Sequence, residues 1–221
     1  MTRDLEKQVR KELQTRLTQH LSQAGFRRTG NGYKRTFGGV SHVVDVQYSK
    51  WKNPNKVSFT LNCGVYVPRV VSVFHGTAEP LRPKLTDCCV YVRGGMLTDE
   101  KLDTWWSVAV EKNIEVASAS SAAEAMIKQH ILPFLERFAE PADVAEFLSS
   151  HRCVSDTFVE PRADAVSHIY AAILWRTAGG SERCREMMDT ALREAARTPL
   201  ADVVAKFAAR FACCDPSATP G

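Results

Sequence analysis

Five polar or charged side chains lie on three segments of the sequence in which polar and apolar residues alternate. They are Asp45, Gln47, Thr60, Asn62 and Arg93. An arginine carries a planar fork of N–H donors that fits a carboxylate or a phosphate, and amide side chains beside it would fix the orientation of a bound group. We therefore take these five residues as a candidate binding surface.

The segments that carry these residues have the pattern of antiparallel strands. The stretch VSFTLNCGVYV, residues 57–67, has apolar residues at every second position, and VVDVQYSKW, residues 43–51, alternates in the same way. Such a strand has one apolar face and one polar face. The intervening KNPN has turn chemistry, so we expect the two strands to pair with Asp45 and Gln47 across from Asn62 and Thr60.

A polar strand face also has a simpler interpretation. Antiparallel sheets commonly leave one face in water, and a row of Ser, Thr and Asn is typical of such a face. Asn62 and Gly64 favour the functional interpretation, because both are poor strand formers and their presence within a strand indicates a bulge or a close approach.

Two adjacent tryptophans, Trp105 and Trp106, are further candidates for binding. They could stack on a partner, since aromatic residues dominate interface energetics, or they could cap the core. We expect LDTWWSVAV, residues 102–110, to be a short helix or a loop, with one tryptophan in the core and the other at a surface.

No catalytic or metal-binding motif is present. A nucleophile needs an adjacent base, and the pairing of Cys88 or Cys89 with His42 or His75 has no motif to support it. The seven cysteines include no C-x-x-C pair and no zinc-finger spacing, so we expect reduced thiols and no structural metal. The sequence also lacks the common nucleotide-binding, esterase and metalloprotease signatures. We therefore expect no catalytic residue, no metal and no cofactor.

Composition and charge limit the classes of protein to which this chain can belong. The 221 residues are 44% hydrophobic and 24% charged, which is typical of a globular protein. No apolar run approaches the roughly 18 residues that cross a bilayer, and the charged beginning is unlike a secretory signal, so we expect a cytoplasmic protein without a membrane partner. Residues 1–60 hold twelve Lys and Arg against four Asp and Glu. This basic region is either a solvated helix face or a surface for an anionic partner.

The remaining patterns indicate an α+β fold. Leucines and a valine at every fourth position predict a helix over residues 3–24 that ends at Gly25, followed by a strand at 33–37 and a Gly38-Gly39 turn. A further strand lies in DCCVYVRGG, residues 87–95. We expect helices at 118–139, 142–150, 162–178, 181–197 and 199–213. Pro133 should kink or restart the first of these, and Ser181 should cap the fourth. The prediction is an N-terminal helix on an antiparallel sheet of four to five strands, divided into an α+β domain at 1–155, a helical extension at 156–214 and a tail at 215–221.

Several short motifs occur in the order found in one family. They are GFRRTGNGYKR, VVDVQYSKW, FTLNCGVYV, CCVYVRGGML, LDTWW and ILPFL. Over about residues 5–140 the chain thus resembles the bacterial family known as domain of unknown function 4304. The resemblance implies an uncharacterised bacterial protein and supports the fold, but it supplies no chemistry.

Three functional hypotheses follow. The first is a non-catalytic cytoplasmic module that binds a macromolecule, another protein above all, in an immunity or defence role. The second is an enzyme or a nucleotide- or anion-binding protein that uses the polar sheet face around Arg93. The third is nucleic-acid binding through the basic first 60 residues.

Overall fold

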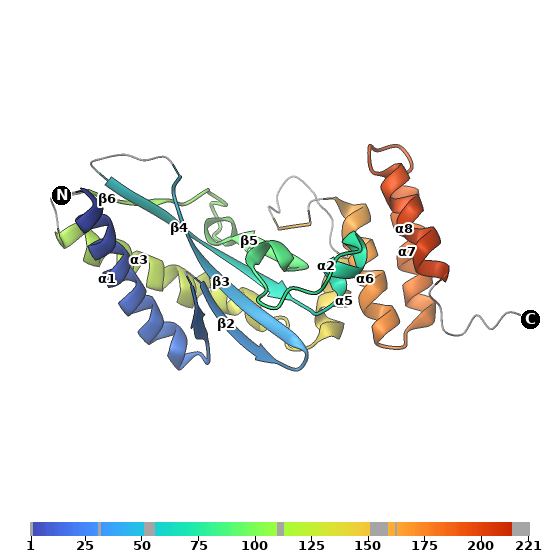
Figure 1. Cartoon of the computed structure of the whole chain (residues 1–221), viewed down its shortest axis with the longest axis horizontal. Helices are drawn as coiled ribbons and strands as arrows, with labels where there is room; N and C mark the ends of the chain where they lie inside the picture. The colour runs from blue at the N-terminus through green and yellow to red at the C-terminus, as the bar shows by residue number, and fades with distance from the viewer. Residues whose placement is uncertain are drawn as a thin grey trace, which may run out of the picture.

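The computed structural model describes residues 2–30, 32–50, 56–109, 113–150, 159–161 and 163–213. An antiparallel sheet is covered on one face by long helices, and a group of helices stands at one end of the sheet (Figure 1). This arrangement confirms the predicted α+β class. The predicted KNPN turn and the C-terminal tail lie outside the described residues.

The sheet has six strands within the described part of the chain. They are β1 (Arg27–Thr29), β2 (Gly32–Phe37), β3 (Val40–Tyr48), β4 (Lys56–Tyr66), β5 (Val90–Arg93) and β6 (Trp106–Ala109). The strands follow the order β1-β2-β3-β4-β5, and β6 also pairs with β4. The prediction of a helix or loop for residues 102–110 is therefore wrong for β6. Trp106 and Val108 alternate as strand residues do, and they pair with Phe59 and Val57.

The first helix, α1 (Thr2–Gln23), has the predicted apolar row and the predicted end. Val9, Leu13, Leu17 and Leu21 are all buried. Gly25 has a φ of 80°, and the Phe26 amide donates to the Leu21 carbonyl at 3.0 Å. A left-handed residue at this place closes the helix because it turns the next amide back onto a free carbonyl.

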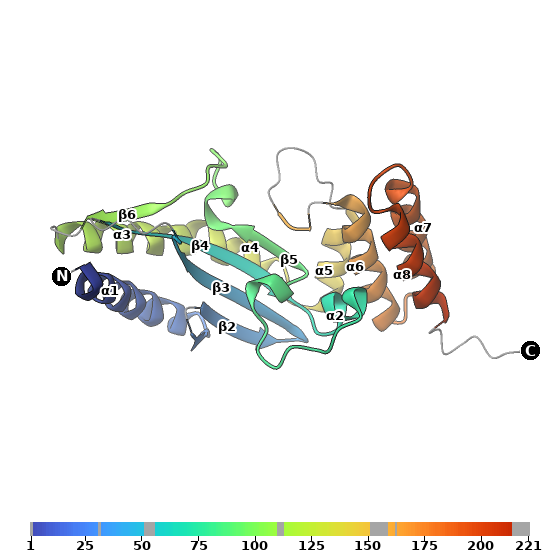
Figure 2. The ribbon, with the colours of Figure 1, turned by 45° about the horizontal axis from the view of Figure 1, so that its top comes forward.

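The second long helical run changes its winding just before Pro133, the position where a disturbance was predicted. It consists of α3 (Asn113–Met126), a π-helical turn (Ile127–Ile131) and α4 (Leu132–Glu136). Pro133 has no N–H to donate to the preceding turn, and a widened turn accommodates the loss. Figure 2 shows α3 and α4 behind the sheet and α1 beside α3.

Shorter helices stand at the end of the sheet. They are α2 (Val70–His75), α5 (Pro141–Ser150), α6 (Asp164–Thr177), α7 (Ser181–Ala195) and α8 (Ala201–Cys213). Single 3-10 turns occupy Leu85–Asp87 and Gly94–Leu97. Ser181 is the first residue of α7 and not its cap. Gly180 holds the N-cap position, so no side chain caps this helix.

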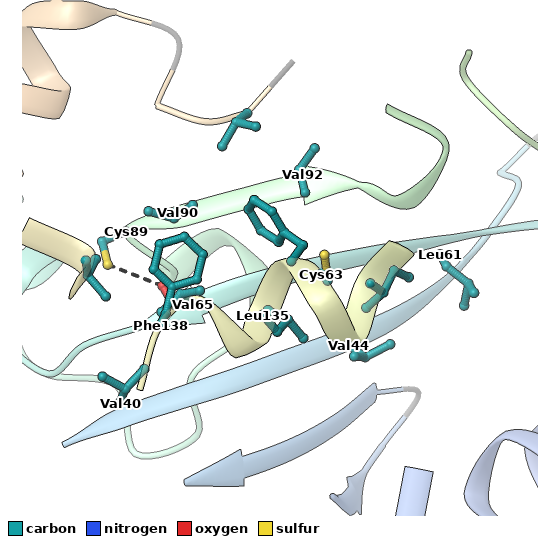
Figure 3. Close-up of a cluster of buried hydrophobic side chains, with 14 of the residues drawn as sticks. Val40, Val44, Leu61, Cys63, Val65, Cys89, Val90, Val92, Leu135 and Phe138 are labelled. Atoms are coloured by element: carbon teal, nitrogen blue, oxygen red, sulfur yellow. Dashed lines mark hydrogen bonds between the residues drawn. The ribbon is translucent and has the colours of Figure 1, made fainter. Parts of the chain in front are cut away.

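The hydrophobic core lies between the sheet and the long helices. Val44, Leu61, Cys63 and Val65 from the strands meet Leu135 and Phe138 (Figure 3). We call this side of the sheet the core face and the opposite side the outer face. The same cluster continues into Ile169 of α6 and Phe207 of α8. Residues on both sides of the proposed boundary at 155 thus contribute to one cluster.

Candidate functional site

The predicted strand pairing brings four candidate residues together on the outer face. Asp45 lies opposite Asn62, and Gln47 lies opposite Thr60. The Asn62 amide Nδ2 donates to Gln47 Oε1 at 3.0 Å. On the other side of β4, Asn62 lies opposite Arg93. The alternating pattern and the turn residues were therefore enough to predict this register.

The carboxylate of Asp45 is half-buried beside these amides. Burial raises the pKa of Asp45 above its ordinary value, and a hydrogen bond with Asn62 opposes this rise. Asn62 itself is only 4% exposed. One amide thus interacts with both Asp45 and Gln47, which fixes the arrangement of the three side chains.

Arg93 is held by two residues of the segment that leads into β6. Its Nη1 donates to both carboxylate oxygens of Asp103, at 2.6 and 2.7 Å. Its guanidinium also lies over the Trp105 ring, 5.3 Å from the centroid. One nitrogen of the arginine is therefore already occupied, and the side chain has a fixed direction.

The same segment covers Thr60. The Thr60 hydroxyl donates to the Thr104 carbonyl at 2.8 Å, and Thr60 is 1% exposed. Gly95 allows this approach, because a Cβ at that position would collide with Leu102 O and would lie 2.5 Å from Thr104 Oγ1. Sequence reasoning missed Asp103 and Thr104. The only available signal was an acidic residue two positions before the tryptophan pair.

The two tryptophans lie on opposite faces of the sheet. Trp106 packs against Phe59 of the core, with ring centroids 5.4 Å apart. Trp105 lies on the outer face with Arg93. Neighbouring strand residues point in opposite directions, so only Trp105 belongs with the other outer-face candidates.

Beyond these residues the outer face becomes apolar and covered. Val43, Tyr66 and Cys88 form a small buried cluster, and Tyr91 packs against it. Gly64 lies beside this cluster, where a Cβ would be 2.9 Å from Cys88 Sγ, from the Tyr91 Cβ and from Val90 O. The prediction that Gly64 marks a close approach is confirmed.

The cysteines and His42 considered for catalysis are not arranged as nucleophile and base. Cys88 belongs to the outer-face cluster, whereas His42 belongs to the core face. Burial raises the pKa of the Cys89 thiol to about 12 and also raises the pKa values of Cys63 and Cys88. A buried thiol of this kind is not a thiolate at neutral pH. Among the described residues, no group of three or more His, Cys, Asp or Glu is arranged to hold a metal ion.

Two of the basic residues near the N-terminus form ion pairs within the first helix. Arg10 pairs with Glu6 at 2.6 Å and stacks on Tyr48, with 3.8 Å to the ring centroid. Arg16 pairs with Glu12 at 2.7 Å. Both acidic partners already belong to the four Asp and Glu counted in residues 1–60, so the net positive charge of this region remains.

The fold and the outer-face residues define an α+β protein whose sheet packs helices on one face and carries a polar, partly covered surface on the other. The chain belongs to the family described as Domain of unknown function (DUF4304), whose model matches residues 17–137. Searches of the curated proteins and of the solved structures found no significant match. In the described part of the chain, no helix has the length and apolar character needed to cross a membrane.

Proposed function

We propose that this protein is a non-catalytic binding module that recognises another protein through its outer sheet face. We call the recognition surface the Arg93 patch. It consists of Asp45, Gln47, Asn62, Arg93, Asp103 and Trp105. The observation that carries the proposal is the fixed position of Arg93 between the Asp103 carboxylate and the Trp105 ring. Arginine and tryptophan are enriched at binding hot spots, and side chains that are already ordered lose little entropy on binding.

The charges of the Arg93 patch favour a protein over a polyanion. The patch holds two carboxylates, Asp45 and Asp103, and one guanidinium. A nucleic-acid backbone would be repelled by the two carboxylates, and a small anion that approached Arg93 would meet the charge of Asp103, which both Nη1 bonds hold beside the guanidinium. A protein surface can instead supply donors to the carboxylates and acceptors to the partly exposed amide of Gln47.

The thiols support the cytoplasmic and non-catalytic parts of this proposal. Cys63, Cys88 and Cys89 are free and buried, as expected for structural thiols in a reducing compartment. An immunity or defence role is one form of the proposal. The net charge of +4 counts against an inhibitor of a basic nuclease, because the two charges would repel.

Site-specific crosslinking tests the proposal. A photoreactive benzoylphenylalanine replaces Trp105 in one version of the protein and Arg183, an exposed residue of α7, in a control version. We expect one partner protein to crosslink from position 105 but not from position 183, in the cells that encode this chain. With the partner purified, Trp105→Ala should weaken binding about thirtyfold, the typical loss at an interface hot spot.

Three results would contradict the proposal. One is equal crosslinking from both positions, and another is unchanged affinity of Trp105→Ala for the captured partner. The third is turnover by the purified protein in a nuclease, phosphatase and hydrolase panel that Arg93→Ala abolishes, which would favour the enzyme hypothesis. An electrophoretic shift of nucleic acid at low salt that weakens steeply with added salt would favour the basic N-terminal region instead.

A further inference from the structure

A second candidate site lies away from the Arg93 patch, among the helices at the end of the sheet (Figure 1), where α2 packs on α6 and hydrogen bonds join α8 to both. A pocket of about 390 Å³ opens between these helices. This volume lies within the range typical of small-molecule sites. Part of the pocket is built by helices outside the segment that matches the family, so the site belongs to this chain and not to the family pattern.

The floor of this pocket is apolar. Val73, Ile173, Phe207 and Phe211 line it. Phe207 and Phe211 stack, with ring centroids 5.2 Å apart, and Phe74 packs against the edge of Phe207. An aryl or alkyl group that entered would be removed from water against these side chains.

Three arginines line the same pocket: Arg69, Arg176 and Arg210. Among its described lining residues none is acidic. Outside the lining, the Glu79 carboxylate accepts a bond from the backbone N–H of Arg69 at 2.9 Å, and the charge of Arg69 helps to lower the pKa of Glu79. Three guanidinium groups around an apolar hollow are complementary to a molecule that joins an anionic group to an apolar body.

Two of these arginines are fixed by helix ends. Arg210 Nη2 donates to the carbonyls of Val73 and Phe74 in α2, at 3.0 Å each. Arg176 Nη1 donates to the Phe211 carbonyl of α8 at 2.6 Å, and its guanidinium stacks on the Phe211 ring. These bonds stabilise the helix ends, and they also hold two positive charges in place beside the pocket.

The backbone near Arg210 leaves room for its guanidinium. Gly76 follows α2 with a φ of 65°, and a Cβ there would lie 2.8 Å from Arg210 Nη1. Any other residue at this position would displace the guanidinium. A neighbouring pocket of about 520 Å³ shares Arg176 and Phe211, but Asp189 lines it and weakens its attraction for an anion.

We propose that the pocket between α2, α6 and α8 binds a small organic oxyanion with an apolar body, such as an alkyl or aryl carboxylate or phosphate. The arginines neutralise the oxyanion, and the phenylalanines cover the apolar part. This site is independent of the protein-binding function proposed for the Arg93 patch.

The test uses a matched pair of fluorescent probes on the full chain. The probe 8-anilinonaphthalene-1-sulfonate carries the anionic group, and N-phenyl-1-naphthylamine has the same aromatic body without it. We expect one anionic probe per chain and affinity for the neutral probe at least about tenfold weaker, because a charge-assisted hydrogen bond is lost. Octanoate or octyl phosphate should displace the anionic probe, whereas 1-octanol should not.

Variants locate the binding. Arg69→Gln should weaken binding about tenfold. The described hydrogen bonds of Arg69 are made by its backbone, but its charge also acts on Glu79, so circular dichroism must show that this variant is folded. Thr177→Phe should block the pocket, since Thr177 is an exposed residue of its lining. Lys206→Gln, four residues before Arg210 on α8 and outside the lining, is the control and should keep the wild-type affinity.

The proposal is overturned if the neutral probe binds as tightly as the anionic one, or if 1-octanol competes as well as octanoate. It is equally overturned if neither probe binds, or if Arg69→Gln and Thr177→Phe both keep the wild-type affinity.

Discussion

The buried His42 should make this protein less stable in mild acid. His42 is 0% exposed, its Nε2–H donates to the Phe138 carbonyl at 2.8 Å, and Arg35 Nε–H donates to its Nδ1 at 3.1 Å. The ring is therefore neutral, because a proton on Nδ1 would remove the acceptor of Arg35 and place two positive charges together.

The size of the effect follows from the two pKa values of this ring. Burial is the main cause that lowers the pKa of His42 from 6.5 to about 4, the bond to Phe138 opposes it, and the charge of Arg35 adds to it. The unfolded chain takes up the proton below pH 6.5, whereas the folded chain takes it up only near pH 4. The free energy of unfolding therefore falls as the pH falls through this window. Between pH 7.5 and pH 5 the loss is about 2 kcal/mol.

Thermal unfolding followed by circular dichroism measures this loss. For a chain of this length, about 2 kcal/mol corresponds to a fall of about 4 to 8 °C in Tm between pH 7.5 and pH 5. In His42→Gln the amide can still donate to Phe138 but does not titrate, so its Tm should fall less over the same interval. Burial also lowers the pKa of His20, which contributes in the same direction to both proteins and cancels in the difference.

The control for replacing a histidine is His75→Gln, at the exposed end of α2. The reasoning is refuted if His42→Gln loses as much stability between pH 7.5 and pH 5 as the wild type does. It is also refuted if the wild-type Tm does not fall over this interval.

Three further predictions concern packing and the separation of function from stability. Gly64→Ala should lower the free energy of unfolding by about 1 to 3 kcal/mol in urea denaturation, because its Cβ would press against the backbone of Val90; an unchanged midpoint would contradict this. Leu17→Ala, at a position that is 0% exposed, should cost about 2 to 5 kcal/mol, whereas Leu81→Ala, at a fully exposed position, should change stability by less than about 0.5 kcal/mol. Arg93→Ala should cost about 1 kcal/mol or less, because its ion pair is partly exposed; a loss of folding would show that this side chain is structural.

The sequence was sufficient where one local rule decided the structure. Alternation and turn residues predicted which residues of β3 and β4 face each other, and Pro133 predicted the interruption of the α-helix before α4. The strand β6 was missed because it has only four residues, too few for the alternation of Trp106 and Val108 to stand out beside Trp105, and because its pairing with residues 56–59 joins segments about fifty residues apart. The contacts of Asp103 and Thr104 follow from that pairing, so they could not be predicted either.

Two strands, β5 and β6, pair with the same edge of β4. The segment between them, residues 94–105, is free to vary in sequence. β6 pairs with residues 56–59 and β5 with residues 62–65, so the chain leaves the edge after Arg93 and returns to it at Trp106. The segment between Arg93 and Trp106 could be lengthened, or its residues exchanged, while both strands stay paired with β4. If the protein-binding function proposed for the Arg93 patch holds, exchanging residues 94–105 between members of the family should change which protein is bound.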